Sequence, residues 1–365
     1  MLPYIALMAV PVLFQHINTK KGTLDVLTND KKNTERAMTL FWVLLFLMLV
    51  LRHDSIGRDL PNYEFIFDYI ARNNWSKALG RSEEIGWSFV NKVVSIFGGD
   101  FRALLIVVAI LSVIFIAIGY IKYSHDAALS VALYMNLSTF IFIFSGLRQS
   151  VAISLGFLAF ELVRKKKFIS FLILVAIAMT FHISAFMLLF MYPLYHVKIK
   201  REHLIFIVPL YFVALLLNQQ IFSFLSDVLS SFADYDTTIE ETGAYAMLVL
   251  FALIAIVSFI VPDETKIDSD TIGIRNFLLL SVGLQMFASL HVLAMRMNYY
   301  YIAFIPILVT RVISTADKKW YKLLVAARYV LIVILVSRFI LSVPEENALD
   351  TFPYKFYWED DFILK

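Results

Sequence analysis

The chain has 365 residues, 60% of them apolar, and a mean hydropathy of +0.76. Soluble proteins contain about 45–50% apolar residues, so the composition predicts an all-α, multi-pass membrane protein. The formal net charge of +3 is too small to indicate a nucleic-acid partner, and the lack of cysteine excludes disulfides, thiolate metal sites and cysteine nucleophiles.

Apolar runs of helical length recur from end to end and predict about twelve transmembrane or partly inserted helices. Several runs are short for a membrane core about 30 Å thick, so tilt or partial insertion is expected. We expect one integral membrane domain over 1–345, followed by a polar and aromatic tail over 346–365. The predicted helices are 2–17, 37–51, 101–121, 127–145, 148–163, 168–181, 183–196, 203–217, 243–261, 275–294, 297–313 and 322–341.

Basic residues in short loops predict the orientation, because cytoplasmic loops carry an excess of lysine and arginine. The strongest marker of the inner side is the run Arg164–Lys167, and the acidic segment 218–242 then falls outside with both termini. This agreement requires a break near His182, since one long helix over 168–196 would invert the later loops. The other basic loops that fall inside are 20–36, 198–201 and 318–322.

The longest loop, roughly residues 52–100, is predicted to lie outside. Within it, residues 83–97 predict an amphipathic helix suited to the membrane interface, and the aromatic segment 62–70 has a similar character. The apolar face of the first of these helices carries Ile85, Phe89, Val93 and Phe97.

Unusual polar residues gather at the outer side in this topology, although they belong to four separate stretches of chain. Scattered residues that snorkel to the membrane surface should divide between both sides, so the clustering indicates a site. The residues are Arg52, His53, Arg58, Asp59, Glu84, Arg148, Gln149, His182 and Arg296.

Arg148 is the most unusual of these residues. Between Ala127 and Val163 the only charges are Arg148 and Glu161. An arginine near the middle of a membrane helix costs about 2.5–3.5 kcal/mol, but the topology places this one at the outer start of a helix. There it either snorkels to lipid headgroups or binds phosphate, whose oxygens match its planar fork.

The other polar residues have similar alternatives. His182 is either a core histidine bonded to a carbonyl or a proton shuttle and phosphate donor. Arg296 either ends a helix beside an aromatic belt or binds a second phosphate. Asp59 and Glu84 are either solvated carboxylates or general bases for a hydroxyl group. The chain has neither G-x-x-x-x-G-K nor G-x-G-x-x-G, which weakens the case for an ATP-driven pump or a nucleotide-sugar transferase.

Five short motifs occur in an order and spacing that resemble a known family. Over about residues 40–310, the chain resembles the EpsG group of Wzy-type bacterial polysaccharide polymerases. The common family pattern has threonine after Gly57 and after Asp59, where this chain has Arg58 and Leu60. The motifs are Arg52-x4-Gly57-x-Asp59-x3-Tyr63, Glu84-x-Gly86, Gly146-x-Arg148-Gln149-x2-Ala152, Phe181-His182-x-Ser184-Ala185 and Arg296-x2-Tyr299-Tyr300.

The resemblance implies a multi-pass glycosyltransferase of the bacterial cytoplasmic membrane with a GT-C-like fold and an outward-facing site. Such an enzyme joins oligosaccharide repeat units linked to undecaprenyl diphosphate and needs no nucleotide sugar or other cofactor. The growing chain moves to the non-reducing sugar of a new lipid-linked unit, and undecaprenyl diphosphate leaves. The implied partners are this lipid-linked oligosaccharide, the bilayer, a chain-length regulator and a flippase.

The resemblance also implies roles for individual residues. Arg148, Gln149 and Arg296 would bind the diphosphates with support from Arg52, and His182 would bind phosphate or transfer a proton. Asp59 or Glu84 would be the base. Arginines can stabilise the departing diphosphate, so no metal is strictly required. A flippase of lipid-linked sugars and a glycan ligase are the alternatives, and the sequence leaves open the sugar, the linkage and the type of polymer, whether capsule, exopolysaccharide or O-antigen.

Overall fold

The computed structural model describes residues 1–18, 31–80, 84–228, 242–341 and 349–359. Over these ranges the chain is built from helices and contains no β-strand, which confirms the all-α class. Three of the described helices are long and apolar enough to cross a membrane singly, and there are five spans if two bent pairs are counted as one each. The larger number of spans stays a prediction.

The first half of the chain supplies two helices, a group of three helices from the long loop, and the helices that follow it. They are α1 (Leu2–Asn18), α2 (Lys31–Leu51), α3 (Leu60–Arg72), α4 (Trp75–Gly80), α5 (Ile85–Ile96), α6 (Phe101–Tyr123), α7 (Ala127–Asn136), α8 (Ser138–Phe142) and α9 (Leu147–Arg164).

The second half continues the bundle with helices of uneven length. They are α10 (Phe168–Phe181), the 3₁₀ helix η1 (Ile183–Phe190), α11 (Met191–His196), η2 (Arg201–His203), α12 (Leu204–Leu216), α13 (Asn218–Val228), α14 (Thr242–Ile260), α15 (Ser269–Gln285), α16 (Val292–Ile302), α17 (Ile305–Ser314), η4 (Lys318–Trp320) and α18 (Tyr321–Leu341).

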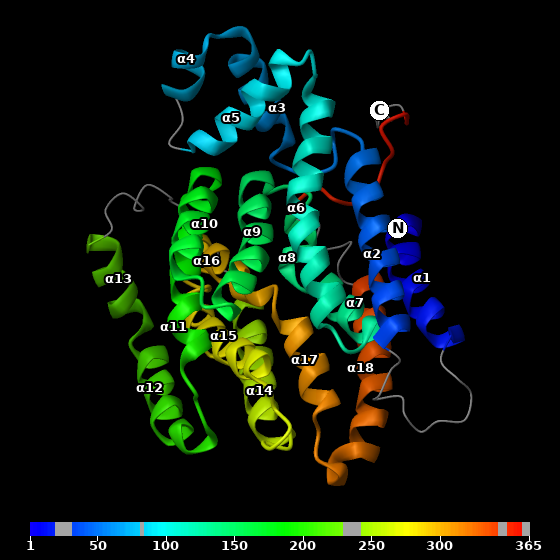
Figure 1. Ribbon diagram of the computed structural model, residues 1–365, viewed down its shortest axis with the longest axis vertical. Coiled ribbons are helices and arrows are strands. Elements are labelled where there is room, and N and C mark those ends of the chain that lie inside the picture. The colour runs from blue at the N-terminus through cyan, green and yellow to red at the C-terminus, as the bar shows by residue number, and fades with distance from the viewer. Residues whose placement is uncertain (19–30, 81–83, 229–241, 342–348, 360–365) are drawn as a thin grey trace.

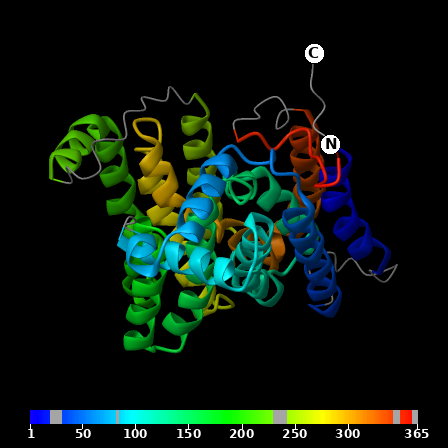
Figure 2. The ribbon, with the colours of Figure 1, turned by 90° about the horizontal axis from the view of Figure 1, so that it is seen from above.

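The helices α3, α4 and α5 form a cap at one end of the bundle, above the upper ends of α9 and α10 (Figure 1). Seen from above, the cap lies crosswise over the bundle (Figure 2). The long loop thus provides the amphipathic helix that the sequence predicts, as α5, and the segment 62–70 lies within α3. We refer to α3, α4 and α5 together as the cap.

The predicted break near His182 is confirmed. α10 ends at Phe181, η1 begins at Ile183, and His182 between them is extended, with φ −157° and ψ 124°. This break lets the chain turn back at the cap end of the bundle, as the distribution of basic loops requires.

Other predicted helices are divided or shifted. The prediction of one helix over 127–145 is wrong. Leu137 has an extended backbone, and it separates α7 from α8. The side chain of Asn136 binds the carbonyl oxygens of Ala132 and Leu335 at 2.8 and 3.0 Å. An asparagine that binds the backbone in this way competes with helix continuation.

The helices near the C-terminal third differ in a similar way. The predicted helix 275–294 is shifted, since α15 begins at Ser269, where Asp268 caps it by accepting a hydrogen bond from a backbone amide. The predicted helix 297–313 is divided into α16 and α17, and Pro306 at the start of α17 has no amide to continue the preceding helix. Part of the predicted acidic loop 218–242 is the helix α13, and residues 229–241 lie outside the described ranges.

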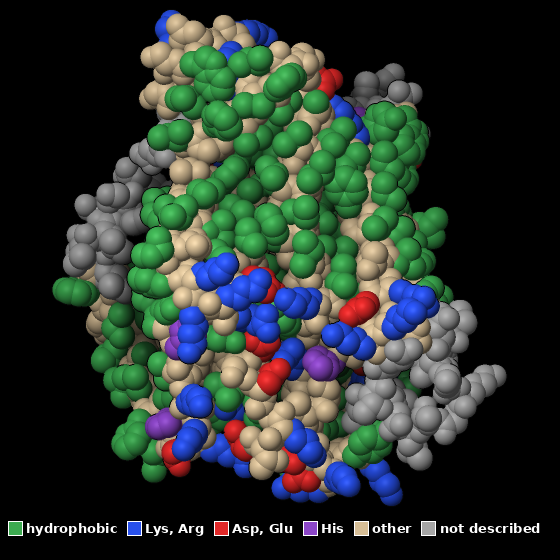
Figure 3. All heavy atoms as spheres, in the orientation of Figure 1, with side chains coloured by type: hydrophobic (Ala, Val, Ile, Leu, Met, Phe, Trp, Pro, Cys, Tyr) green, Lys and Arg blue, Asp and Glu red, His purple; other side chains and the backbone are tan. Residues whose placement is uncertain are grey.

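The end of the bundle opposite the cap is rich in ion pairs. Arg164 binds Asp270 at 2.6 Å, and Lys122 binds Glu161 at 2.7 Å. Burial opposes ionisation of Asp268, but Arg311 and Thr271 together lower its pKa to about 2. Figure 3 shows most charged side chains of this face gathered below a broad hydrophobic surface. This basic end is the one that the sequence predicts to face the cytoplasm.

One buried ion pair joins α18 to the start of α7, and it allows a test of stability. The carboxylate of Asp126 caps α7 and binds the guanidinium of Arg328, with 3.0 Å between Nη2 and Oδ1. We expect Asp126→Ala to lower the free energy of unfolding by about 3–5 kcal/mol, because it leaves a buried guanidinium unpaired. Thermal unfolding in detergent measures this loss.

Two further variants control for other causes. Arg328→Met on the Asp126→Ala background should recover part of the stability, since no unpaired charge is left. Asp68→Ala, which breaks the exposed pair with Arg72, should change stability by about 1 kcal/mol at most. An Asp126→Ala protein as stable as wild type would contradict the structural role of this pair.

Candidate functional site

The carboxylate of Glu84 connects residues from two other helices. Its Oε1 lies 2.6 Å from Nδ1 of His182, and its Oε2 forms an ion pair with the guanidinium of Arg148. The side chains of Glu84, His182 and Arg148 are 9%, 16% and 33% exposed. The cluster of these three residues is therefore closed around the carboxylate and open at the arginine.

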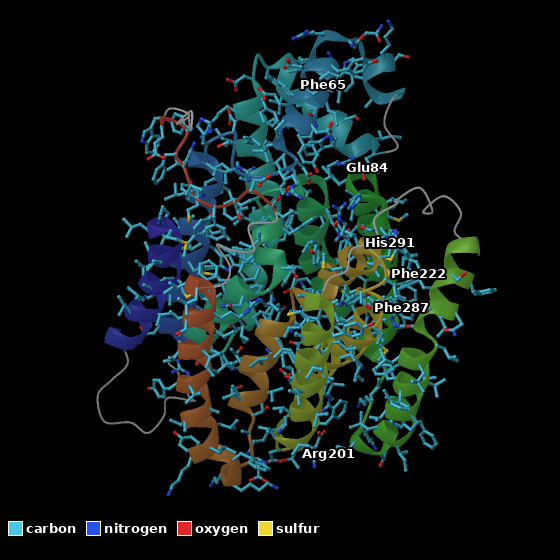
Figure 4. All side chains as sticks on the ribbon, turned by 180° about the vertical axis from the view of Figure 1, so that it is seen from behind. Phe65, Glu84, Arg201, Phe222, Phe287 and His291 are labelled. Atoms are coloured by element: carbon cyan, nitrogen blue, oxygen red, sulfur yellow. The ribbon has the colours of Figure 1, made fainter. Side chains whose placement is uncertain are left out.

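Each member of the cluster stands at a helix end. Glu84 precedes α5, His182 follows α10, and Arg148 lies in the first turn of α9. Figure 4 shows Glu84 where the cap meets the bundle, at the opposite end of the molecule from Arg201. The sequence predicted that these three residues share a side of the membrane, and the structure brings them into contact.

Gly86 explains how α5 comes so close to α10. A Cβ at this position would lie 2.2 Å from Oγ1 of Thr180, so only glycine allows the approach. Thr180 lies two residues before His182 and Gly86 lies two residues after Glu84. The close approach therefore sets the contact between the carboxylate and the imidazole.

The loop before α3 packs against the turn that leads into α9. Arg52 donates from Nη1 to the carbonyl oxygen of Phe144 at 2.6 Å, and the amide of Asp59 donates to Oγ of Ser145 at 3.2 Å. Burial lowers the pKa of Arg52 to about 10, so the guanidinium stays charged at neutral pH. Arg52 is thus engaged with the backbone two residues before Gly146.

Tyr63 is a site residue to which sequence reasoning gave no role, although it belongs to the first motif. The guanidinium of Arg148 lies 5.5 Å from the centroid of its ring, and the ring of Trp87 lies 5.1 Å away on α5. Burial raises the pKa of the Tyr63 phenol, while Arg148 lowers it. Asp59 stands one turn earlier, half-buried, and its side chain does not cap α3.

Gln149 and Arg296 lie next to the cluster. Nε2 of Gln149 donates to the backbone oxygen of Arg296 at 2.7 Å, which brings α16 beside the first turn of α9. The Arg296 guanidinium lies 5.9 Å from the ring centroid of Phe142 and forms no ion pair with any residue that the structure describes. The amide nitrogen of Gln149 is thus occupied by backbone and its Oε1 is buried without a hydrogen-bond partner, while Arg296 has no ion pair among the described residues.

The C-terminal residues 349–359 form a strap over the loop that carries Arg52 and Asp59. Three loop amides donate to carbonyl oxygens of this strap, at 2.9–3.0 Å. Tyr354 anchors the strap by donating to the carbonyl oxygen of Met48 at 2.7 Å. The donating loop residues are His53, Gly57 and Arg58, and the accepting residues are Lys355, Asp350 and Leu349.

His53 and Arg58 therefore face the strap. The structure does not bring them to the Glu84 cluster, and Arg58 instead pairs with Asp350 at 3.4 Å. The strap falls within the predicted tail, whose aromatic run around Tyr354 was the signal for packing that sequence reasoning did not use. Among the described residues, no group of three or more His, Asp or Glu side chains could hold a metal ion.

Comparisons with known proteins place the chain in a family. The model of the EpsG family matches residues 36–356, a range that includes the loop before α3, the Glu84 cluster, Arg296 and most of the strap. No curated protein and no solved structure matches the chain. Because the family match covers most of the sequence, the protein belongs to the EpsG family of polysaccharide polymerase-type membrane proteins.

Proposed function

We propose that this chain is a glycosyltransferase that polymerises oligosaccharide repeat units carried on undecaprenyl diphosphate, at the outer face of the bacterial cytoplasmic membrane. The family supports the polymerase class. The observation that carries the proposed chemistry is the carboxylate of Glu84 bound to both Arg148 and His182. The proposal includes a GT-C-like bundle of about twelve spans, with a flippase and a chain-length regulator as partners.

His182 is the proposed general base. When Glu84 is ionised it can only accept hydrogen bonds, so the close contact at Nδ1 requires His182 to donate from that nitrogen. The second ring nitrogen, Nε2, then carries the lone pair that accepts a proton. Glu84 fixes the orientation of the ring and stabilises the imidazolium that forms, as a buried carboxylate does in a catalytic triad.

The proposed reaction balances without another reactant. A hydroxyl of the non-reducing sugar attacks the anomeric carbon of the chain on the second carrier, and its proton passes to Nε2 of His182. The bond between the anomeric carbon and the diphosphate oxygen breaks, and the electron pair leaves with undecaprenyl diphosphate. Arg148 and Arg296 stabilise the negative charge that develops on this leaving group.

The two arginines differ in how much charge they offer. Glu84 already balances the charge of Arg148, whereas Arg296 has no ion pair among the residues with a described structure. Arg296 is therefore the stronger source of net positive potential at the site, and Arg148 contributes donors that are already oriented by Glu84 and Tyr63. Asp59 stays the alternative base on the neighbouring loop.

We expect Arg296→Ala to lower kcat/KM for polymerisation by about 100-fold, because the diphosphate loses a charge-assisted bidentate partner. Arg296→Lys should recover part of this loss, since it keeps the charge without the fork. The amount of folded protein should stay near that of wild type, because no described carboxylate is left unpaired. An Arg296→Ala protein with wild-type kcat/KM would exclude this residue from diphosphate binding.

The biochemical class is tested by the species that accumulate when the chain is inactivated in cells. A polymerase defect leaves single repeat units on the outer surface, which is the result we expect. Accumulation of precursors that face the cytoplasm would indicate a flippase. Polymer of normal length that is not attached to its final acceptor would indicate a ligase, and either outcome would overturn the proposal.

A further inference from the structure

The helix α5 is amphipathic, but its polar side is buried and its apolar side is exposed, the reverse of a helix on a water-soluble protein. Its buried side contains Ser88, Asn91 and Lys92 beside Trp87. Its outward side is apolar, and its most exposed residues are Ile85 at 54%, Phe89 at 52%, Ile96 at 55% and, directly after it, Phe97 at 86%. A helix that buries its polar residues and exposes isoleucine and phenylalanine is typical of a non-aqueous setting.

Two side chains on the polar side of α5, Lys92 and Asn91, bind backbone carbonyl oxygens of the cap. Nζ of Lys92 donates to the carbonyl oxygens of Ile70, Ala71 and Asn73, at 3.3, 3.2 and 2.6 Å, and so closes the C-terminal end of α3. The amide of Asn91 donates to the carbonyl oxygen of Trp87 at 2.8 Å. The polar side of α5 is therefore buried within the protein, and its apolar residues face outward.

The outward side of α3 is more polar than that of α5. It presents Glu64 and the exposed ion pair between Asp68 and Arg72, at 3.1 Å. The outward side of α3 also carries Phe65, which is 64% exposed and lies farther from the bundle than Glu84 does (Figure 4). The cap thus has a mixed surface on α3, with three charged side chains and Phe65, and an apolar surface on α5.

We infer that α5 lies in the plane of the membrane, with its apolar side immersed in the acyl chains of the outer leaflet. The contact between Gly86 and Thr180 fixes α5 on the end of α10, next to the apolar surface of the bundle. That surface includes the exposed residues Ile110 and Ile114 of α6, and Figure 3 shows hydrophobic side chains continuing from the bundle to the cap. Lipid is the proposed occupant, because the apolar side of α5 extends the apolar surface of α6, a helix long and apolar enough to cross a membrane.

The position of α5 in the membrane would set the depth of the candidate site relative to the lipid headgroups. Glu84 immediately precedes α5, so an immersed α5 holds its carboxylate at the level of the lipid headgroups. The further consequence, that Arg148 and Arg296 then meet the diphosphate of a lipid carrier at its own depth, rests on the proposed function. The position of α5 in the membrane does not depend on that function, because it is argued from the exposed residues of α5 and from its place beside the apolar surface of the bundle.

Spin labels measure this immersion directly, because the chain has no cysteine of its own and single cysteines can be introduced without background. The full-length protein is reconstituted into vesicles of bacterial phospholipid and labelled at position 89, 96 or 97. Matched controls carry the label at position 114 on α6, facing lipid, and at position 64 on α3, facing water. Collision rates with oxygen and with a water-soluble nickel chelate report the environment of each label.

We expect the labels on α5 to behave like the label at 114, with collisions with oxygen favoured several-fold over collisions with nickel. Labels at 89 and 97 that collide with nickel as often as the label at 64 would overturn the inference. The readout does not depend on catalysis. Immersed labels in a protein that forms no polymer would contradict the proposed function alone. Water-exposed labels in an active polymerase would contradict the immersion of α5 alone.

Discussion

Replacing Glu84 with glutamine should lower the rate of polymerisation by about 100-fold or more, while the amount of folded protein stays close to that of wild type. Glutamine keeps an oxygen that accepts from Arg148, so the guanidinium retains a hydrogen bond and the cap stays docked. The negative charge that orients His182 and stabilises its imidazolium is lost. The rate of glycosidic bond formation by the purified protein measures the effect.

Glu64→Gln is the matched control for this change. Glu64 lies on α3 of the same cap and is exposed. Its replacement by glutamine removes the same charge as Glu84→Gln, but outside the cluster. It should polymerise at nearly the wild-type rate. Glu84→Asp keeps the charge but shortens the side chain, so it should fall between the wild type and Glu84→Gln. A Glu84→Gln protein as fast as Glu64→Gln would remove Glu84 and the orientation of His182 from the mechanism.

Gly57→Ala should destabilise the loop before α3 by about 3 kcal/mol. Gly57 has φ +120°, and a Cβ would lie 2.3 Å from the carbonyl oxygen of Phe144. That oxygen cannot move away without breaking its hydrogen bond with Arg52. The change should therefore disturb both the loop and the turn that leads to Arg148, and lower the thermal midpoint and the activity together.

Two other glycines separate the causes of this effect. Gly98 has φ +77° but no atom within 4 Å of its Cβ position, so Gly98→Ala carries backbone strain alone, about 1 kcal/mol. Gly80 has open space and no positive φ, so Gly80→Ala should change stability by less than about 0.5 kcal/mol. Equal stability of all three variants would contradict the close packing of the loop against Phe144.

The helices that the sequence predicted best are those with a clear local signal. The apolar run of α6 and the break at His182 followed from hydropathy and from the positions of basic loops. The break at Leu137 and the start of α15 at Ser269 depend on side chains that bind the backbone, and a hydropathy pattern does not contain this information. α13 was missed because its sequence lies within a segment that reads as an acidic loop.

Part of the candidate site could also be predicted, because polar residues are rare enough in an apolar chain to be noticed. Glu84, Arg148 and His182 were placed on one side of the membrane, but not in contact. Which side chain meets which depends on the close approach of α5 and α10 at Gly86, a tertiary feature. The strap was missed since residues 349–359 have no helical or strand periodicity, and their hydrogen bonds join them to residues about three hundred positions earlier in the chain.

The most direct test of the central claim is the stoichiometry of the reaction catalysed by the purified protein in vesicles. The vesicles contain repeat units linked to undecaprenyl diphosphate and no nucleotide sugar, and the released undecaprenyl diphosphate is counted against the glycosidic bonds formed. We expect one carrier to be released for each bond, and both products to fall together in Glu84→Gln. Polymer that lengthens without release of the carrier, or only when a nucleotide sugar is added, would contradict the account.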